Sequence, residues 1–372
     1  MKPNIIFILL DGARWDRITK SNEFQEICKE GTLLNNVSTA MPYTIGSINV
    51  TFSGLYGKEN GIDGYYKMLR LKKTIKNFPE IFQSQGYFTG CDVLTDKIIP
   101  DRGFDIHQVH DEYNDDLFQR HPEFIKKCLK NAQEKPLFLF LYFSKIHTNT
   151  VSEVLKKYEW NDKKFYENKE ENLERYDSGF KDAGKYSKFI LNELKKNNLK
   201  ENTIVIFFSD HGTGIGERFG ERNYGSFTYE ETIRTFYLFI GDGIQKNRQS
   251  DSLRATIDIF PTLMNLCNFD LEFERPGSSF VDYLLNKEND LEQKSFTFSE
   301  TGALHGPYPS PDISNVFAIK TPKYKMMYSK AQKEWQFFDL QNDSMEKNNI
   351  FTGKTNIELE LKKELENWLN RE

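Results

Sequence analysis

The chain has 372 residues, of which 38% are hydrophobic and 14% aromatic, so it can bury a sizeable core, and intrinsic disorder is excluded. Its 55 acidic and 50 basic residues give a formal net charge of -5. No basic stripe stands out along the chain, which excludes nucleic acid as the main partner. The length allows one large α/β domain with an appendage, or two ordinary domains.

The four cysteines lie far apart and form no CxxC pair, which indicates buried thiols in a reducing compartment. The apolar run near the N-terminus, residues 5–10, ends at an aspartate and is too short for a signal peptide or a membrane span. No other stretch reaches the length of a membrane span. We therefore expect a cytoplasmic protein without a membrane segment.

Strands buried on both faces of a sheet are predicted where β-branched, aromatic and other apolar residues follow one another without interruption. Four such runs lie at residues 5–10, 136–143, 203–208 and 236–240. Helical patterns lie at residues 21–30, 75–86, 115–133, 172–197 and 253–267. Strands that alternate with helices predict an α/β fold with a doubly wound, mostly parallel sheet. In such sheets, ligands bind at the carboxyl ends of the strands.

The second half of the chain shows two changes of pattern. The polar segment 148–172 predicts a loop or an excursion over the edge of the sheet. From about residue 294 to 350, short alternating runs separated by turn residues indicate a small antiparallel sheet, and an amphipathic helix follows at 356–370. We therefore predict an α/β domain of residues 1–290 that carries the site, with a C-terminal β subdomain and terminal helix, residues 291–372, packed on it.

Two of the predicted strands lead directly into acidic or histidine residues. Asp11 follows the first strand, and Asp210-His211 follows the third. A carboxylate and an imidazole at adjacent positions beyond a strand can both reach one cation, because the chain turns there. This pair suits zinc or manganese better than calcium. The alternative is that each aspartate is a turn former or helix cap and that His211 is a surface residue.

Thr44 lies at a predicted entry into a helix, between Pro42 and Gly46. Free backbone N–H groups at a helix N-terminus favour an anion. A hydroxyl bound to a metal there loses its proton more easily and can attack phosphorus or sulfur. The alternative is an ordinary threonine N-cap.

Taken together, these segments resemble the alkaline phosphatase/sulfatase superfamily. Residues 3–16 are similar to the opening of sulfatases and related phosphohydrolases. In that superfamily the nucleophile stands ten positions before the glycine of a Thr-Gly or Ser-Gly pair. Ser53-Gly54 matches the pair, and the count leads to Thr44. Further segments resemble the family in the same order, at residues 136–147, 202–212, 229–234, 257–263 and 338–349.

The resemblance implies roles for five residues. Thr44 is the expected nucleophile. His147 is expected either to lie behind the metal ligands or to contact the substrate, where it can protonate the leaving oxygen. The expected metal ligands are Asp11, Thr44, Asp210 and His211. One divalent cation is predicted, with zinc or manganese favoured over calcium or magnesium.

The sequence departs from the sulfatases at the nucleophile. Those enzymes oxidise a cysteine or serine within Cys-x-Pro-Ser-Arg to formylglycine, whereas residues 44–48 are Thr-Ile-Gly-Ser-Ile. Sulfatases also carry an Asp-Asp pair and an Asp-Asn pair for calcium, where this chain has Asp11-Gly12 and Asp210-His211. From these departures we predict phosphoryl chemistry: a hydrolase of phosphoric mono- or diesters that acts through a covalent phospho-threonine at Thr44.

Three alternatives stay open. The first is a transferase that moves a substituted phosphoryl group from a soluble donor to a sugar or glycan hydroxyl. The second is a sulfuric ester hydrolase, that is, a sulfatase in the strict sense. The third is a binding module that keeps the fold without the activity. The expected substrate is a small-molecule or glycan phosphoester, and the sequence names neither the leaving group nor the oligomeric state.

Residues 224–227 are Tyr-Gly-Ser-Phe, where relatives often carry a histidine or lysine in a Gly-His-Gly context. A ligand for a second metal is missing at this place, so a second cation is doubtful. Candidates for contacting the substrate instead are His305, Arg218, Arg222 and Ser226.

Overall fold

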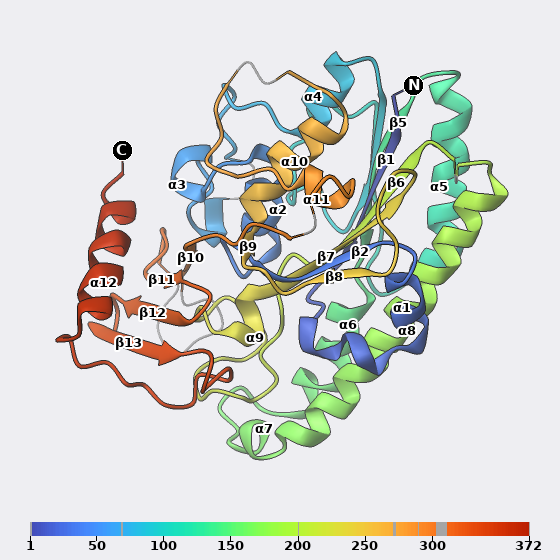
Figure 1. The fold of residues 1–372 in the computed structure, drawn as a ribbon. Helices are drawn as coiled ribbons and strands as arrows, with labels where there is room; N and C mark the ends of the chain where they lie inside the picture. The colour runs from blue at the N-terminus through green and yellow to red at the C-terminus, as the bar shows by residue number, and fades with distance from the viewer. Residues whose placement is uncertain are drawn as a thin grey trace.

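The computed structural model describes residues 2–67, 70–199, 201–270, 273–288, 290–302 and 311–371. Among these residues, nine strands form one sheet and four strands form a second sheet (Figure 1). The order of the large sheet is β4-β3-β5-β1-β6-β7-β2-β8, and β9 pairs with β2. Its strands are β1 (Asn4–Leu10), β2 (Thr32–Ser38), β3 (Phe88–Val93), β4 (Ile106–Val109), β5 (Leu137–Phe143), β6 (Thr203–Phe208), β7 (Arg234–Gly241), β8 (Arg248–Ser250) and β9 (Arg254–Ala255).

The strands β4, β3, β5, β1 and β6 run parallel, so their carboxyl ends meet at one edge of the sheet. β7 is antiparallel to both of its neighbours, β6 and β2. The predicted α/β fold with a mostly parallel sheet is therefore confirmed. The four predicted strands are present as β1, β5, β6 and β7.

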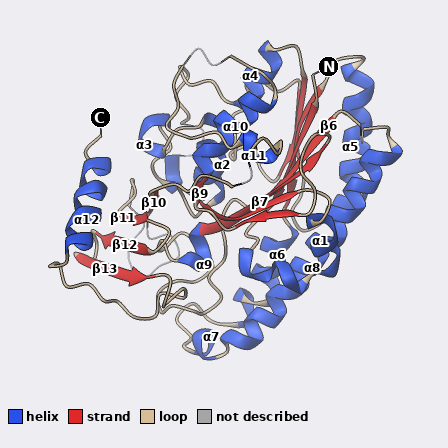
Figure 2. Ribbon diagram, viewed as in Figure 1, coloured by secondary structure: helices blue, strands red, loops and turns tan. Residues whose placement is uncertain are grey.

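Helices cover both faces of the large sheet, which makes three layers (Figure 2). Along β1, Phe7 and Leu9 belong to one core cluster, and Ile6 and Ile8 belong to the other. The first face carries α2 (Thr44–Ser53), α4 (Phe78–Ser84), α10 (Ile259–Leu266) and α11 (Val281–Leu284). The second carries α1 (Asn22–Cys28), α5 (Leu117–Ala132), α6 (Lys145–Glu153) and α8 (Lys169–Lys196). The five predicted helices are present as α1, α4, α5, α8 and α10.

Shorter helical pieces connect these elements. The short α-helices are α3 (Gly57–Asn60), α7 (Lys164–Glu167) and α9 (Glu230–Ile233). Turns of 3-10 helix lie at Trp15–Lys20, Tyr65–Lys67, Leu155–Lys157 and Thr256–Asp258. Within the described residues, no helix combines the length and the apolar character that crossing a membrane requires.

Residues 148–172 are mostly helical, so the predicted loop was wrong. The segment contains most of α6, a 3-10 turn, α7 and the start of α8. Its few apolar side chains fix it to the protein, because Val154 and Phe165 are both fully buried in the second core cluster. The Asn149 side chain also donates to the carbonyl of Arg175 on α8 (3.1 Å). A polar helical segment with so few apolar residues shows little hydrophobic periodicity, so its sequence does not predict a helix.

The second sheet is antiparallel and lies at the C-terminal end of the chain. It consists of β10 (Thr297–Thr301), β11 (Val316–Lys320), β12 (Tyr324–Ser329) and β13 (Glu334–Asp339). The terminal helix α12 (Asn356–Leu369) packs Leu365 and Trp368 into a shared core with Phe298 and Phe317. The Glu300 N–H donates to the carbonyl of Ala40, which joins this sheet to the segment after β2 (2.8 Å). The predicted C-terminal antiparallel sheet is present, and the boundary between 290 and 291 stays a prediction.

A buried group of two lysines and two glutamates also connects the second sheet to the first. Lys320 Nζ lies 2.7 Å from Glu230, and Lys325 Nζ lies 2.6 Å from Glu346. These four side chains, which we call the ionic network, are at most 7% exposed. Burial raises the pKa of Glu230, but the charges of Lys320 and Lys325 outweigh this effect and lower that pKa to about 2. Pairing is what makes charges at this depth tolerable.

Candidate active site

Three side chains from neighbouring strands come together at the carboxyl edge of the large sheet. Asp11 follows β1, and Asp210 and His211 follow β6, which pairs with β1. One ligand atom from each residue lies within 4.8 Å of the others, and all three residues are buried. His211 Nε2 is 3.6 Å from Asp11 Oδ1 and 3.5 Å from Asp210 Oδ2. We call this group the catalytic cluster.

The turn after β1 holds the cluster in place. Gly12 has a φ of +70°, and a Cβ atom there would lie 2.9 Å from Thr213 Oγ1, so both the conformation and the space favour glycine. The N–H groups of Gly12 and His211 both donate to Asp210 Oδ1, at 3.2 Å and 2.9 Å. One oxygen of Asp210 is therefore fixed by the backbone, and the other faces the cluster.

The hydrogen bonds of His211 identify its tautomer. Its Nδ1 lies 2.7 Å from the carbonyl of Gly212, which can only accept, so Nδ1 carries the proton. Nε2 therefore presents an unshared electron pair to the two carboxylates. Asp11 Oδ1 and Asp210 Oδ2 are buried and have no hydrogen-bond partner among the described residues. Two carboxylates and an imidazole nitrogen that face one another without hydrogen bonds between them match the ligand set of a divalent cation.

The catalytic cluster is also short of positive charge. No lysine or arginine in the described part of the chain forms an ion pair with Asp11 or Asp210. Burial and then the charge of Asp210 raise the pKa of Asp11 to about 7, against the opposing effects of His211 and Tyr142. A bound cation would supply the missing charge and keep both carboxylates ionised.

Thr44 is the first residue of α2 and faces the cluster. Its Oγ1 donates to His211 Nε2 at 3.3 Å. Gly46 permits the tight entry into the helix, because a Cβ atom there would lie 2.5 Å from the Met41 sulfur. Ser47 Oγ donates to the carbonyl of Asp210 at 2.8 Å, which ties the first turn of α2 to the end of β6. The start of α2 and its hydrogen bond to the end of β6 therefore keep the Thr44 hydroxyl at the cluster.

His147 lies on α6 at the mouth of the cluster. Its Nδ1 is 3.9 Å from Asp11 Oδ2, and its side chain is 18% exposed, so it lies between the buried carboxylate and solvent. Burial lowers the pKa of His147, which keeps the ring neutral near pH 7. The structure thus brings together all five residues for which the resemblance implied a role.

Two tyrosines that the sequence did not point to complete the site. The Tyr142 hydroxyl on β5 donates to Asp11 Oδ2 at 2.7 Å. The Tyr224 ring lies over His211, with ring centroids 4.4 Å apart, and its centroid is 5.7 Å from that of His147. In the sequence, Tyr142 is one of seven consecutive buried residues of β5, and nothing in that run marks its hydroxyl.

The two predicted arginines are bound to other parts of the protein. Arg218 pairs with Glu231 at 2.9 Å and donates to the carbonyl of Glu346, which links it to the C-terminal segment. Arg222 donates to four carbonyls, those of residues 155, 158, 159 and 160. Neither guanidinium pairs with the catalytic cluster, so their contact with a substrate stays a prediction.

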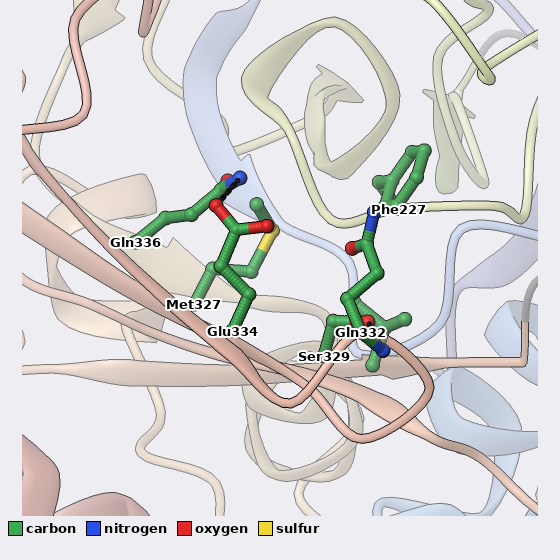
Figure 3. Close-up of a pocket in the computed structure, with 7 residues that line it drawn as sticks. Phe227, Met327, Ser329, Gln332, Glu334 and Gln336 are labelled. Carbon is green, nitrogen blue, oxygen red and sulfur yellow. Dashed lines mark hydrogen bonds between the residues drawn. The ribbon is translucent and has the colours of Figure 1, made fainter.

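The remaining two predicted substrate contacts are Ser226 and His305. Ser226 is fully buried, and its neighbour Phe227 lines a small cavity beside β12 and β13 (Figure 3). That cavity has a volume of about 10 Å³, enough for a water molecule at most and far too small for a substrate. His305 lies outside the described residues.

Comparison with known families decides the class of the chain. The family model "Sulfatase" matches residues 3–269, and a second one, "N-sulphoglucosamine sulphohydrolase, C-terminal", matches residues 220–371. The chain belongs to the sulfatase family. This family of hydrolases lies within the predicted alkaline phosphatase/sulfatase superfamily, and its members typically bind a divalent cation.

Curated sulfatases are similar over about half of this chain. Arylsulfatase K of Mus musculus is 28% identical over 184 residues, which cover 49% of this chain and 32% of the relative. Delta 4,5-hexuronate-2-O-sulfatase of Bacteroides thetaiotaomicron is 26% identical over 188 residues, which cover 49% of this chain and 38% of the relative. These matches therefore span about a third of the relatives' own length.

Solved structures of sulfatases and of a phosphonate monoester hydrolase superpose on nearly the whole chain. A 2-O GAG sulfatase gives a TM-score of 0.81 at 17% identity and covers 100% of this chain and 92% of its own. A protein solved with its substrate D-glucosamine-2-N,6-O-disulfate gives 0.75 at 17% identity, covering 99% and 97%. Phosphonate monoester hydrolase of Agrobacterium radiobacter gives 0.73 at 14% identity, covering 98% and 95%. At these identities the likenesses establish the fold alone.

The predicted preference for phosphoric esters, with its phospho-threonine, is wrong. Both matching family models and the curated relatives are sulfatases. The prediction was based on one nucleophile position and two aspartate pairs. Those positions hold the attacking group and the cation ligands, and none of them was chosen for a contact that separates sulfate from phosphate. Sulfuric and phosphoric esters are both tetrahedral at the reacting atom, so these few positions do not distinguish them.

Proposed function

We propose that this chain is a metal-dependent sulfuric ester hydrolase that acts on sulfated glycans. The observation that carries the proposal is the catalytic cluster with the Thr44 hydroxyl 3.3 Å from His211 Nε2, in a chain of the sulfatase family. The relatives support the substrate class, because one is named a hexuronate-2-O-sulfatase and one similar structure contains a disulfated glucosamine. The cytoplasmic location predicted from sequence stays a prediction.

The residues present fit a divalent cation. Asp11, Asp210 and His211 would hold it, with Thr44 beside them, and a carboxylate and imidazole set of this kind favours zinc or manganese. When bound, such a cation neutralises the carboxylates and stabilises negative charge on the sulfate oxygens. This role matters here because the described residues offer the cluster no lysine or arginine.

The chain's own groups divide the remaining work. The Thr44 hydroxyl gives up its proton, and its oxygen forms a bond to sulfur while the bond from sulfur to the sugar oxygen breaks. The sugar oxygen takes up that proton, so the sugar leaves as an alcohol. Water then cleaves the sulfo-threonine, which restores the Thr44 hydroxyl and releases inorganic sulfate. His147, neutral and partly exposed, donates a hydrogen bond to the departing sugar oxygen. Tyr142 keeps Asp11 in position through its hydrogen bond.

A substrate panel tests the proposal. Protein loaded with zinc or manganese is incubated with sulfated glucosamine and hexuronate saccharides, with nitrophenyl sulfate, and with nitrophenyl phosphate. We expect release of inorganic sulfate, and a loss of about 10³-fold or more in Thr44→Ala. Thr51→Ala is the matched control, since Thr51 lies on the same helix and its hydroxyl pairs with Tyr237 (3.4 Å). Absence of sulfate release from every sulfate ester, or full activity of Thr44→Ala, would overturn the proposal.

A further inference from the structure

A second group of metal-ligating side chains lies two strands away from the catalytic cluster in the large sheet. Asp92 is on β3, His110 directly follows β4, and His121 is on α5. One ligand atom from each residue lies within 4.8 Å of the others. All three residues are at most 2% exposed. The proposed reaction uses none of them.

Asp92 is an ionised carboxylate in this interior. Its Oδ1 lies 2.7 Å from His110 Nδ1, and its Oδ2 accepts from Arg120 Nε at 2.8 Å and from Gln108 Nε2 at 3.0 Å. All three of these contacts are with N–H donors, which is what an ionised carboxylate requires. The carboxylate is thus anchored from the Arg120 side. On its other side, Oδ1 accepts from His110 Nδ1, because a carboxylate can only accept, so His110 must move this proton to Nε2 before Nδ1 can bind a cation.

His121 contributes an electron pair that nothing in the described residues uses. Its Nδ1 forms a hydrogen bond with the Tyr186 hydroxyl, while its Nε2 is buried without a partner. A proton on Nε2 would find the Asp92 carboxylate close by, yet no hydrogen bond joins them. We therefore assign the proton to Nδ1, which donates to Tyr186, and the unshared pair to Nε2.

We propose that Asp92, His110 and His121 bind a structural divalent cation, zinc above all, that is separate from the cation of the catalytic cluster. Two imidazoles and one carboxylate are ligands that zinc accepts. Two imidazoles on one tetrahedral zinc would have ring centroids about 5 Å apart, given Zn–N bonds of about 2.0–2.1 Å. The centroids of His110 and His121 are 6.0 Å apart, so a small closure suffices.

The surroundings match the usual environment of a structural metal. Ligating histidines commonly donate their other ring N–H to a neighbouring group, as His121 does to Tyr186. The Ser144 hydroxyl lies 3.4 Å from His110 Nε2, and Ser144 precedes α6, which carries His147. A cation here would join β3, β4 and α5 and would support the end of β5. Because the group is buried, the cation enters as the chain folds.

The amount of bound zinc reports on this second site once the carboxylates of the catalytic cluster have been removed by substitution. The double variant Asp11→Asn/Asp210→Asn is refolded with zinc, passed over a desalting column and analysed by plasma mass spectrometry. We expect about one zinc per chain, and none after His121→Gln is added. His107→Gln in the same background is the matched control. His107 lies on β4 and its Nε2 is also buried without a partner in the described residues, yet it belongs to neither cluster.

Two further measurements, the Tm and the visible absorption of bound cobalt, distinguish the loss of the metal site from poor folding of a variant. Zinc should raise the Tm of the double variant and of its His107→Gln form, but not of its His121→Gln form. Cobalt in place of zinc should show the strong visible absorption of tetrahedral sites, and Asp92→Asn should abolish it. A double variant that refolds without retaining zinc would show that the three residues form only a hydrogen-bonded cluster. Zinc retained by the His121→Gln form would equally overturn the proposal.

Discussion

Two groups of buried carboxylates in this protein have opposite surroundings. In the ionic network, Glu230 and Glu346 face Lys320 and Lys325, and all four side chains lie in the interior. In the catalytic cluster, two carboxylates face each other and His211, and the described residues provide no lysine or arginine. Both groups are equally buried, so the difference lies in how their charge is compensated.

The pKa values show the consequence of this difference. The two lysines lower the pKa of Glu230 to about 2, whereas burial and the charge of Asp210 raise the pKa of Asp11 to about 7. Within the ionic network, burial and the charge of Glu230 raise the pKa of Glu346 to about 7 against the opposing charge of Lys325, so the contrast with Asp11 holds for Glu230 alone. Paired carboxylates thus hold the two sheets together. Carboxylates without a protein cation mark the place where an external cation is needed.

The largest expected effect comes from removing one carboxylate of the catalytic cluster. Asp210→Asn should lower sulfate release by about 10³-fold or more, because a bound cation supplies several kcal/mol of charge stabilisation. Without metal, the same variant should be at least as stable as the wild type, since it relieves repulsion between Asp11 and Asp210. Enzyme assays and thermal melts in a chelator measure the two effects. A marked loss of stability in the chelator would contradict the comparison.

The opposite result is expected in the ionic network. Lys325→Met should reduce the free energy of unfolding by about 3 kcal/mol or more, because it leaves buried glutamates without a partner. Urea denaturation measures this change, and Lys323→Met is the control, because Lys323 is exposed at the neighbouring turn. Adding Glu346→Gln should recover part of the loss. A change below about 1 kcal/mol would mean that the ion pairs of Lys325 stabilise the protein no more than exposed ion pairs do, and would contradict the comparison.

The sequence predicted the catalytic cluster better than its surroundings. Asp11 and Asp210-His211 stood out because each follows an apolar strand, with only Ser209 between β6 and Asp210, and the family resemblance then assigned them as ligands. β3 was missed, since its six residues include Gly90 and Asp92 and lack such a run. Tyr142 was missed because its partner, Asp11, lies 131 residues away on a neighbouring strand. Contacts of this range depend on which strands pair, and local patterns do not contain that information.

The raised pKa of Asp11 predicts how cation binding depends on pH. A carboxyl with a raised pKa in the folded state favours the protonated folded form. The metal-free protein should therefore lose stability as the pH rises from the unfolded value of 3.8 to about 7. A cation must displace that proton, so its affinity should fall about tenfold per pH unit below pH 7.

Thermal melts with and without zinc or manganese between pH 5.5 and 8 check this dependence. The stabilisation by the cation should grow with pH and level off above about pH 7. Asp210→Asn serves as the control, since removing the second cause of the shift should move the pH dependence of the metal-free protein to lower pH. An affinity that does not change with pH would mean that Asp11 is already ionised before the cation binds.

The smallest of these effects should come from Tyr142, which contacts Asp11 without facing the unpaired oxygens. Tyr142→Phe removes the donor to Asp11 Oδ2 and should lower both kcat/KM and cation affinity by about 10-fold, as loss of an outer hydrogen bond to a metal ligand commonly does. Tyr87→Phe is the control. Tyr87 is equally buried, but it precedes β3 and so lies at the amino ends of the parallel strands, whereas the catalytic cluster lies at their carboxyl ends. If both variants behave like the wild type, Asp11 is held by its cation alone. A drop in kcat/KM confined to Tyr142→Phe would show that the cluster depends on a protein donor as well as on the external charge.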